Sequence, residues 1–455
     1  MKQVWAERLR ILRSQKFARF KRRWLYHFQQ HPRVFLSEVT LLTRLPALLA
    51  ILSHHVHGFA SEGNDGYFQI AQNVVTRGII GLDSHHLLTR GPLFPLILAP
   101  GFLLQHPVLW TLAVNLAASI GICLLVFEAC LLWSQSSVAA SAAAFLVVAN
   151  PWLIWTVKNP TPTITATFLT ALASYLLARI AFSSPGKEMK FCLYLGGASA
   201  LAALDHPALI ALIAGFSAAL FLILWHKRAI SPLLGLIVLW SGFAACIAPY
   251  SYRNFRITGR FIPVADSAPF SYLMGTGLFG SSIYPVGDFR DFSKVAARLH
   301  VTVEDLDVQF YTIDDRYYPL LSSLAKQDFE TLLIKHPLYL LFRTFIMSLW
   351  FWCAGDKFVW LTVAHCVYWL LFASGMIVAI RRQGVTTIAP FVALVIPGAL
   401  LHGMSMPLIG YAAYSIPYCV LLAAPLAIGL KDSKLLDKLL PQSERRACIP
   451  AQPGR

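Results

Sequence analysis

Charged side chains are scarce in this chain. Only 13% of its 455 residues are Asp, Glu, Lys or Arg, whereas 57% are hydrophobic and the mean hydropathy is +0.60. Soluble domains carry about 25% charged residues. The composition therefore excludes a soluble globular protein and indicates a polytopic membrane protein.

Several sequence signals of other functions are also missing. The eight cysteines form no CxxC pair and lie mostly inside apolar runs, so they favour small core side chains over a disulfide framework or a zinc site. No Walker or GxGxxG loop occurs, and we expect energy to arrive in an already activated substrate. The first apolar run starts too late for a cleavable signal peptide.

The charge that is present is mostly positive and uneven, with a formal net charge of +16. Residues 1–33 contain ten Lys or Arg and one acid, Glu7. Aromatic and apolar residues are interleaved there at helical spacing, next to an apolar run. We interpret 1–33 as a basic amphipathic arm that binds anionic lipid on the cytoplasmic side; nucleic-acid binding is the alternative.

Apolar runs long enough to cross a bilayer, about 20 residues, predict an all-α integral membrane protein with about ten transmembrane helices. Two shorter pieces, 92–104 and 337–353, are predicted as interfacial helices. The ten runs are 34–53, 108–131, 137–156, 162–181, 191–205, 207–225, 231–250, 357–380, 386–403 and 411–429.

Loop charge predicts the orientation, because cytoplasmic loops carry an excess of Lys and Arg. The arm and the tail 430–455 are then cytoplasmic. The outer face receives a first loop, 54–107, the turn 150–161, and a small mixed region, 251–356. In this organisation 34–250 is an N-terminal membrane module, and 357–429 supplies the C-terminal membrane helices.

Acidic and basic residues stand out on that outer face. Glu62 and Asp65 follow the first apolar run, where a carboxylate at the membrane edge is costly unless it has a function. Arg253, Arg256 and Arg260 follow the outer end of a span, where loop statistics do not place them. Because Arg presents a fixed fork of donors, these residues and Arg90 are candidates for phosphate recognition; ordinary headgroup contact is the alternative.

The order of motifs resembles the GT-C superfamily of membrane glycosyltransferases, in particular protein O-mannosyltransferases and the lipid A aminoarabinose transferase. An Asp65, Tyr67, Ala71 motif is followed by Pro92-Leu93-Phe94-Pro95. Further motifs are Pro249-Tyr250-Ser251-Tyr252-Arg253-Asn254, His336-Pro337 and Tyr414-Ser415-Ile416-Pro417. The chain differs from the family pattern at Gly63-Asn64, where an acidic pair is usual, at Ala412-Ala413, and at Asp205-His206, where an arginine is often found.

The resemblance implies transfer of a sugar from a polyprenyl-phosphate carrier to an acceptor on the extracytoplasmic side, with inversion. Asp65 is the expected base, with Glu62 as the second candidate, and Arg253, Arg256 and Arg90 are expected to bind the donor phosphate. The expected partners are membrane lipids and a glycan, lipid or protein acceptor, and the expected location is a bacterial inner membrane. The residues expected around the substrate are Tyr67, Asn254, Asp205, His206 and Tyr414.

Two other functions stay open from the sequence. A transporter or flippase for a lipid-linked saccharide would share the phosphate-binding arginines but need no base, and a scaffold of the cell envelope would need neither. Asp205 and His206 form either a polar turn or a second proton carrier. We predict no cofactor; a divalent metal at His54, His55, His57, His85 and His86 is the alternative to hydrogen-bonding histidines.

Overall fold

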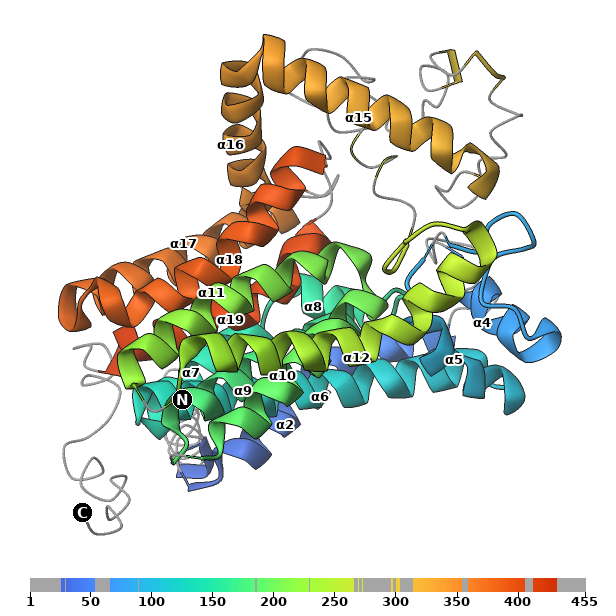
Figure 1. The fold of residues 1–455 in the computed structure, drawn as a ribbon. Coiled ribbons are helices and arrows are strands. Elements are labelled where there is room, and N and C mark those ends of the chain that lie inside the picture. The colour runs from blue at the N-terminus through green and yellow to red at the C-terminus, as the bar shows by residue number, and fades with distance from the viewer. Residues whose placement is uncertain are drawn as a thin grey trace.

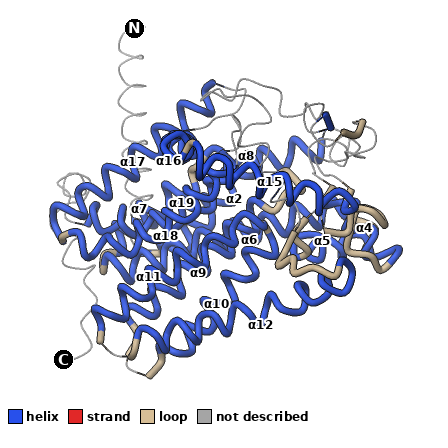
Figure 2. Tube along the Cα trace, turned by 45° about the horizontal axis from the view of Figure 1, so that its top comes forward, coloured by secondary structure: helices blue, strands red, loops and turns tan. Residues whose placement is uncertain are grey.

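The structure is a computed structural model that describes residues 26–28, 30–53, 66–88, 90–184, 186–228, 230–265, 314–353, 359–405 and 412–431, with isolated residues at 269, 272, 296–297 and 300–302. The described part consists of helices joined by loops and contains no strand (Figure 2). Most helices run side by side along one direction and form an elongated bundle (Figure 1).

The N-terminal half of the bundle matches the predicted runs closely. Its helices are α2 (Pro32–Ser53), α4 (Tyr67–Arg77), α5 (Leu93–Leu103), α6 (Pro107–Ser134), α7 (Ser137–Val148), α8 (Pro151–Thr156), α9 (Thr163–Phe182) and α10 (Glu188–Asp205). The predicted span 137–156 is wrong in one respect, because it is two helices. Asn150 ends the first helix and caps the second by accepting hydrogen bonds from the N–H groups of Trp152 and Leu153.

The C-terminal half follows with η1 (Pro207–Ala211), α11 (Leu212–Lys227), α12 (Pro232–Thr258), η3 (Asp315–Tyr317), α15 (Tyr318–Lys335), α16 (Pro337–Cys353), α17 (Val359–Gln383), α18 (Val385–Ser405) and α19 (Ala412–Lys431). α12 continues beyond the predicted 231–250, so Arg253 and Arg256 lie in its last turns, where cations interact favourably with the helix dipole. α15 and the upper part of α16 stand apart from the bundle (Figure 1).

Large apolar side chains cover much of the outside of the bundle. Trp225, Leu233 and Leu370 are each at least 65% exposed. Such a surface is unfavourable in water and suits lipid. Four stretches in the described part are long and apolar enough to cross a membrane, namely α6, α9, Pro207–Lys227 and α12. The protein is therefore a multi-pass helical membrane protein; the expected number of ten spans is not tested.

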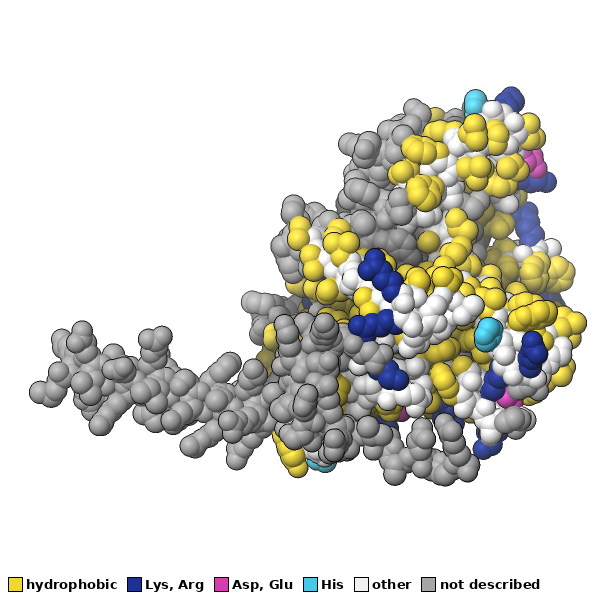
Figure 3. Space-filling view, turned by 90° about the vertical axis from the view of Figure 1, so that its left-hand side faces the viewer, with side chains coloured by type: hydrophobic (Ala, Val, Ile, Leu, Met, Phe, Trp, Pro, Cys, Tyr) yellow, Lys and Arg dark blue, Asp and Glu magenta, His cyan; other side chains and the backbone are white. Residues whose placement is uncertain are grey.

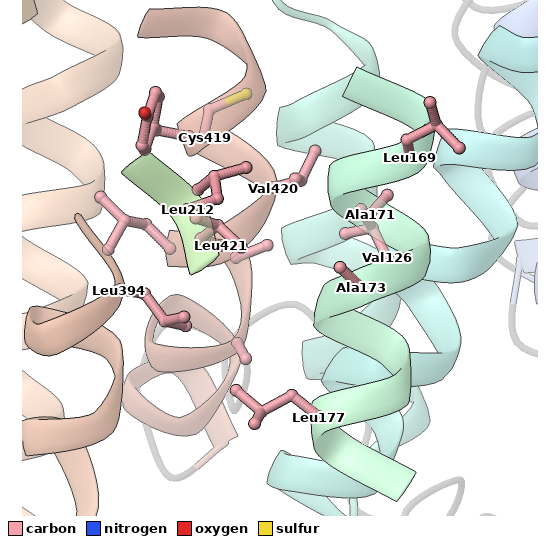
Figure 4. Packing of buried hydrophobic residues seen from close by; sticks show 14 of the residues in the cluster. Val126, Leu169, Ala171, Ala173, Leu177, Leu212, Leu394, Cys419, Val420 and Leu421 are labelled. Atoms are coloured by element: carbon pink, nitrogen blue, oxygen red, sulfur yellow. The ribbon is translucent and has the colours of Figure 1, made fainter. Parts of the chain in front are cut away.

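The interior is packed with aliphatic side chains from distant parts of the chain. Leu177 of α9 points toward the helix α19, which contributes Val420 and Leu421 to the same cluster (Figure 4). Close approach of α10 and α12 depends on glycine, since a Cβ on Gly196 would overlap the Leu239 carbonyl, and a Cβ on Gly242 would overlap the Leu193 carbonyl. The two helices are therefore in backbone contact near the middle of the bundle.

The bundle has two chemically different ends. The Lys227 end is formed by the end of α9, the start of α10 and the end of α11, joined by Lys227. The start of α18 belongs to it, because Trp133 packs on both Phe182 and Phe391. Figure 3 views this end, where basic side chains lie between apolar ones. The basic residues near the helix termini at this end are Arg179, Lys187, Lys190, Lys227, Arg228, Arg381 and Arg382.

The opposite end, called the α4 end below, is formed by α4 and the start of α5 together with the end of α10 and the end of α12 (Figure 1). Nearly all of the sequence-predicted site residues that the structure describes lie there.

Candidate functional site

The α4 end begins at Gly66, which has a φ of 82° and precedes α4 as its N-cap residue. A Cβ at Gly66 would overlap the Leu82 side chain, so only glycine suits this position. Tyr67 follows and is buried, with its ring edge-on to Phe94 at a centroid distance of 5.5 Å. The predicted base Asp65 and the second candidate Glu62 lie outside the described residues, but Asp65 is directly bonded to Gly66.

Residues 78–88 and 90–92, together called the outer loop here, return from α4 to α5 in a fixed conformation. The buried Asn73 side chain donates from Nδ2 to the carbonyls of Gly81 (3.0 Å) and Leu82 (2.6 Å). The Leu82 N–H donates to His86 O at 3.0 Å. These bonds satisfy buried backbone groups that no helix or strand pairs, so the loop is well defined.

Two of the loop's polar side chains, Asp83 and His86, hold each other. His86 is fully buried, and its Nδ1 lies 2.9 Å and 3.0 Å from the two Asp83 carboxylate oxygens. Burial raises the pKa of Asp83, but hydrogen bonds from His86 and from the N–H groups of His85 and His86 lower it by more, so its pKa lies below the ordinary value. The two side chains are therefore held together within the outer loop.

Arg253 reaches from α12 to the outer loop. Its Nη2 donates to Ile80 O at 2.7 Å, and its Nη1 lies 3.3 Å from Leu87 O and 3.1 Å from Asn254 Oδ1. The guanidinium also lies over the Tyr250 ring, 5.2 Å from the centroid. Arg253 therefore fastens the outer loop to α12, and a phosphate would have to share its remaining donors.

The neighbours of Arg253 divide into one buried and two exposed groups. Asn254 is fully buried and donates to Ile262 O (2.9 Å) and Val264 O (3.3 Å), so in this structure it holds the turn after α12. Arg256 and Arg260 are exposed, and Arg256 Nη1 lies 3.3 Å from the Tyr252 hydroxyl. These two arginines present their charge to the surroundings of the α4 end.

Arg90 closes the outer loop beside Tyr67. Its guanidinium carbon lies 5.8 Å from the centroid of the Tyr67 ring. The next residue, Gly91, lies against the end of α10, since a Cβ there would overlap the Leu204 carbonyl and lie 3.2 Å from Asp205 O. The structure thus brings together three sequence-predicted site positions, Tyr67, Arg90 and Asp205, that are distant in the chain.

Asp205 is a fully buried carboxylate at the C-terminal end of α10. Its Oδ2 accepts a 2.7 Å hydrogen bond from Thr165 Oγ1, and its Oδ1 accepts none from the residues the structure describes. A solvated polar turn is therefore excluded. His206 is half-buried beside it and links α10 to η1 through its backbone.

The segment Asp314–Tyr317 docks on the outer loop from outside. The Asp315 N–H donates to His85 O at 2.8 Å, and Asp315 Oδ2 accepts from the Leu87 N–H at 2.7 Å. Burial raises the pKa of Asp314, but its bonds to Arg316 lower it by more, and His85 Nδ1 lies 4.0 Å away. Leu87 is therefore held from two sides, by Arg253 at its carbonyl and by Asp315 at its N–H.

The remaining predicted residues are Tyr414 and the histidines. Tyr414 lies in the first turn of α19, and its side chain is outside the described residues. His54, His55 and His57 are also outside them, and within the described part no three His, Cys, Asp or Glu side chains gather into a metal-binding group. Sequence reasoning missed Asn73, Thr165 and Asp315, whose only signal is a polar residue beside an apolar stretch.

Comparisons with known proteins give a remote structural similarity. No family model matches the chain, and no curated protein sequence matches it. Two solved structures are similar to it, both of ArnT from Cupriavidus metallidurans. The structure with bound undecaprenyl phosphate gives a TM-score of 0.39 with 14% identity, over 87% of this chain and 77% of that one. The apo structure gives 0.34 and 14%, over 80% and 72%. At these scores the similarity does not assign a family, and the function is argued from this chain's own residues.

Proposed function

We propose that this protein is an integral membrane glycosyltransferase that takes a sugar from a polyprenyl-phosphate donor and passes it, with inversion, to an acceptor on the extracytoplasmic side. One observation carries the proposal. Arg253 of α12 donates hydrogen bonds to the outer loop, which contains Arg90, and Arg90 lies over Tyr67, two residues after Asp65. Cations suited to phosphate departure thus belong to the α4 end, and the proposed base precedes the first described residue of that end, Gly66, in the sequence.

The cations supply the donor site in this proposal. Arg90, Arg256 and the remaining donors of Arg253 would stabilise the phosphate that leaves with the lipid. The lipid chain would lie along the apolar outside of the bundle, as the exposed aromatic and aliphatic side chains permit. Asp65, or Glu62 in its place, would accept the acceptor proton as the new glycosidic bond forms.

Sugar transfer in lipid nanodiscs tests this function. The purified protein is given a panel of polyprenyl-phosphate sugars and soluble or lipid acceptors, and released polyprenyl phosphate is measured. Asp65→Asn should lower kcat by roughly a hundredfold or more while donor binding persists. Arg90→Ala should weaken donor binding instead.

Two variants serve as matched controls. Arg381→Ala removes an arginine at the Lys227 end, and Glu330→Gln removes an exposed acid of α15; both should behave as wild type. Full activity of Asp65→Asn would show that the base is another residue. Donor binding without any turnover across the panel would overturn the transferase and favour a transporter of lipid-linked saccharides.

A further inference from the structure

The short helix α8 has an unusual setting for a membrane protein. The chain leaves α7 at Val148, turns at Asn150-Pro151, forms six residues of helix, and turns again over 157–162 before α9. A break between helices frees carbonyl groups that lipid cannot satisfy, so such breaks need donors from the protein.

The break before α8 is fully provided with donors. Each of the last four carbonyl oxygens of α7 accepts a hydrogen bond, two of them from side chains of α2 and α17. The four pairs are Ala149 N–H to Phe145 O (2.8 Å), the Tyr368 hydroxyl to Leu146 O, Asn150 N–H to Val147 O (3.2 Å) and Arg44 Nη1 to Val148 O (3.0 Å). The direction in which α8 leaves α7 is therefore fixed by tertiary contacts.

The turn after α8 is held as firmly, at both sides of Lys158. The fully buried Asn115 of α6 donates from Nδ2 to Val157 O at 2.9 Å and to Asn159 O at 3.0 Å. With the carbonyls before and after it fixed, Lys158 has little freedom except in its own side chain.

Lys158 is a cation that has no carboxylate partner among the residues the structure describes. Its Nζ lies 3.5 Å from the centroid of the Trp155 ring, and it makes no hydrogen bond or ion pair to any residue in the described ranges. Partial burial lowers its pKa. A half-buried ammonium held only by an aromatic ring is a cost that an anionic ligand would relieve.

The position of the turn connects Lys158 to the α4 end. Val157 is fully buried in a small apolar cluster with Tyr67 and Phe94. Arg90 lies over the same Tyr67 ring. The turn that carries Lys158 and the loop that carries Arg90 are therefore joined to the same apolar cluster, through Val157 and Tyr67.

We propose that Lys158 is an anion-binding residue of this site and contacts a phosphate oxygen of the lipid-linked donor, with Trp155 holding the ammonium in place until the ligand arrives. The identity of the ligand as a donor lipid rests on the proposed function; the binding of a phosphate by Lys158 does not. The charge of Lys158, its fixed turn and the apolar cluster that joins this turn to the Arg90 loop support recognition of a phosphate by Lys158 together with Arg90.

Equilibrium binding to the full chain in neutral-lipid nanodiscs tests the proposal without any sugar or acceptor. The probes are polyprenyl phosphate, polyprenol, inorganic phosphate and phosphatidylglycerol supplied in the nanodisc. Lys158→Gln should weaken polyprenyl-phosphate binding by roughly tenfold to a hundredfold, while Lys158→Arg should restore most of it. Thermal unfolding of both variants should stay close to wild type, because the contact of Lys158 with Trp155 is a single cation–π interaction and the described residues give Lys158 no hydrogen bond or ion pair.

Two further variants separate the effect of the Lys158 charge from general electrostatic and structural effects. Lys326→Gln, an exposed lysine of α15, should bind as wild type. Asn115→Ala should weaken binding less than Lys158→Gln, because it loosens the turn and leaves the charge. Tighter binding of polyprenyl phosphate than of polyprenol or phosphatidylglycerol identifies the donor-type lipid as the source of the phosphate; inorganic phosphate alone would identify a small-anion site.

Three results would overturn the proposal. Unchanged affinity in Lys158→Gln beside a large loss in Arg90→Ala would remove Lys158 from the site and leave the proposed transferase intact. Failure of the wild type to bind any of the phosphate probes would also show that Lys158 is not an anion-binding residue. A loss in Lys158→Gln that Lys158→Arg does not restore would assign the residue a packing role. Conversely, phosphate binding through Lys158 in a protein that transfers no sugar would sustain Lys158 and contradict the proposed function.

Discussion

The two ends of α10 each bury a carboxylate, and they treat it in opposite ways. Glu188 lies in the first turn, at the favourable end of the helix dipole, and pairs with Lys227 at 2.9 Å. Asp205 is the last residue, at the unfavourable end, and within the described part of the chain its carboxylate accepts a hydrogen bond from the Thr165 hydroxyl alone. Within one helix, the surroundings of Glu188 stabilise its negative charge, whereas the surroundings of Asp205 do not. That contrast is the pattern of a residue retained for a function.

The largest expected effect is at the Lys227 end. Lys227→Met would leave the Glu188 carboxylate buried without its partner and should lower the free energy of unfolding by about 3 kcal/mol. The loss also removes the bonds from Lys227 to Ile180 O and Ser183 O. Denaturation in detergent measures the change.

A double variant sharpens this result. Glu188→Gln combined with Lys227→Met should recover a large part of the lost stability, because no unpaired charge remains. Equal instability of the single and double variants would show that the backbone bonds of Lys227 matter more than the ion pair.

The next prediction concerns the opposite end of the same helix. Asp205→Asn keeps an acceptor for Thr165 and removes a carboxylate that lacks a cation in the described structure, so stability should change by less than about 1 kcal/mol. The rate of sugar transfer should nevertheless fall by more than this small loss of folded protein explains. A strongly destabilised Asp205→Asn would contradict the contrast between the two acids, and Thr165→Val is the control for the loss of the hydrogen bond alone.

A smaller, local effect is expected where Asp315 meets the outer loop. Asp315→Ala removes the acceptor of the Leu87 N–H and should speed hydrogen exchange at that amide, at a cost of about 1 kcal/mol. Glu330→Ala, on the exposed side of α15, is the control. Unchanged exchange at Leu87 would show that Arg253 alone holds the loop.

The smallest effect is one of pH. The pKa values of Asp83 and Asp314 are lowered in the folded protein, so the stability they contribute is present above the ordinary carboxylate pKa of about 3.9 and is lost as the pH falls through the lowered values. Exchange in the outer loop should therefore rise only below about pH 4. A rise already near pH 6 would point to the histidines instead.

Sequence patterns predicted most helices to within a few residues, because membrane-length apolar runs are a strong and local signal. The break at Asn150-Pro151 was missed, although an N-cap asparagine before proline is itself a local signal. The site was predicted only in outline. That Arg90 and Tyr67 are neighbours follows from a loop conformation set by Asn73, Arg253 and Asp315, and such distant contacts leave no local trace.

Arg253 also shows that a sequence pattern does not predict which groups a side chain contacts in the fold. The sequence predicts a phosphate-binding arginine from its place at the end of a span, and the structure places it where most of its donors hold Ile80 and Leu87. Charge and position identify a residue worth study, whereas its partners depend on how the backbone folds around it.

The glycine contacts between α10 and α12 have a consequence for how this protein can vary. Because Gly196 and Gly242 each admit the other helix's backbone, neither helix can slide or rotate without the other. Asp205 and Arg253, one near the end of each helix, therefore keep a fixed separation. An exchange of α10 alone with that of a related protein would misplace both, whereas exchanging α10 and α12 as a pair would preserve their spacing and leave the loops free to change substrate.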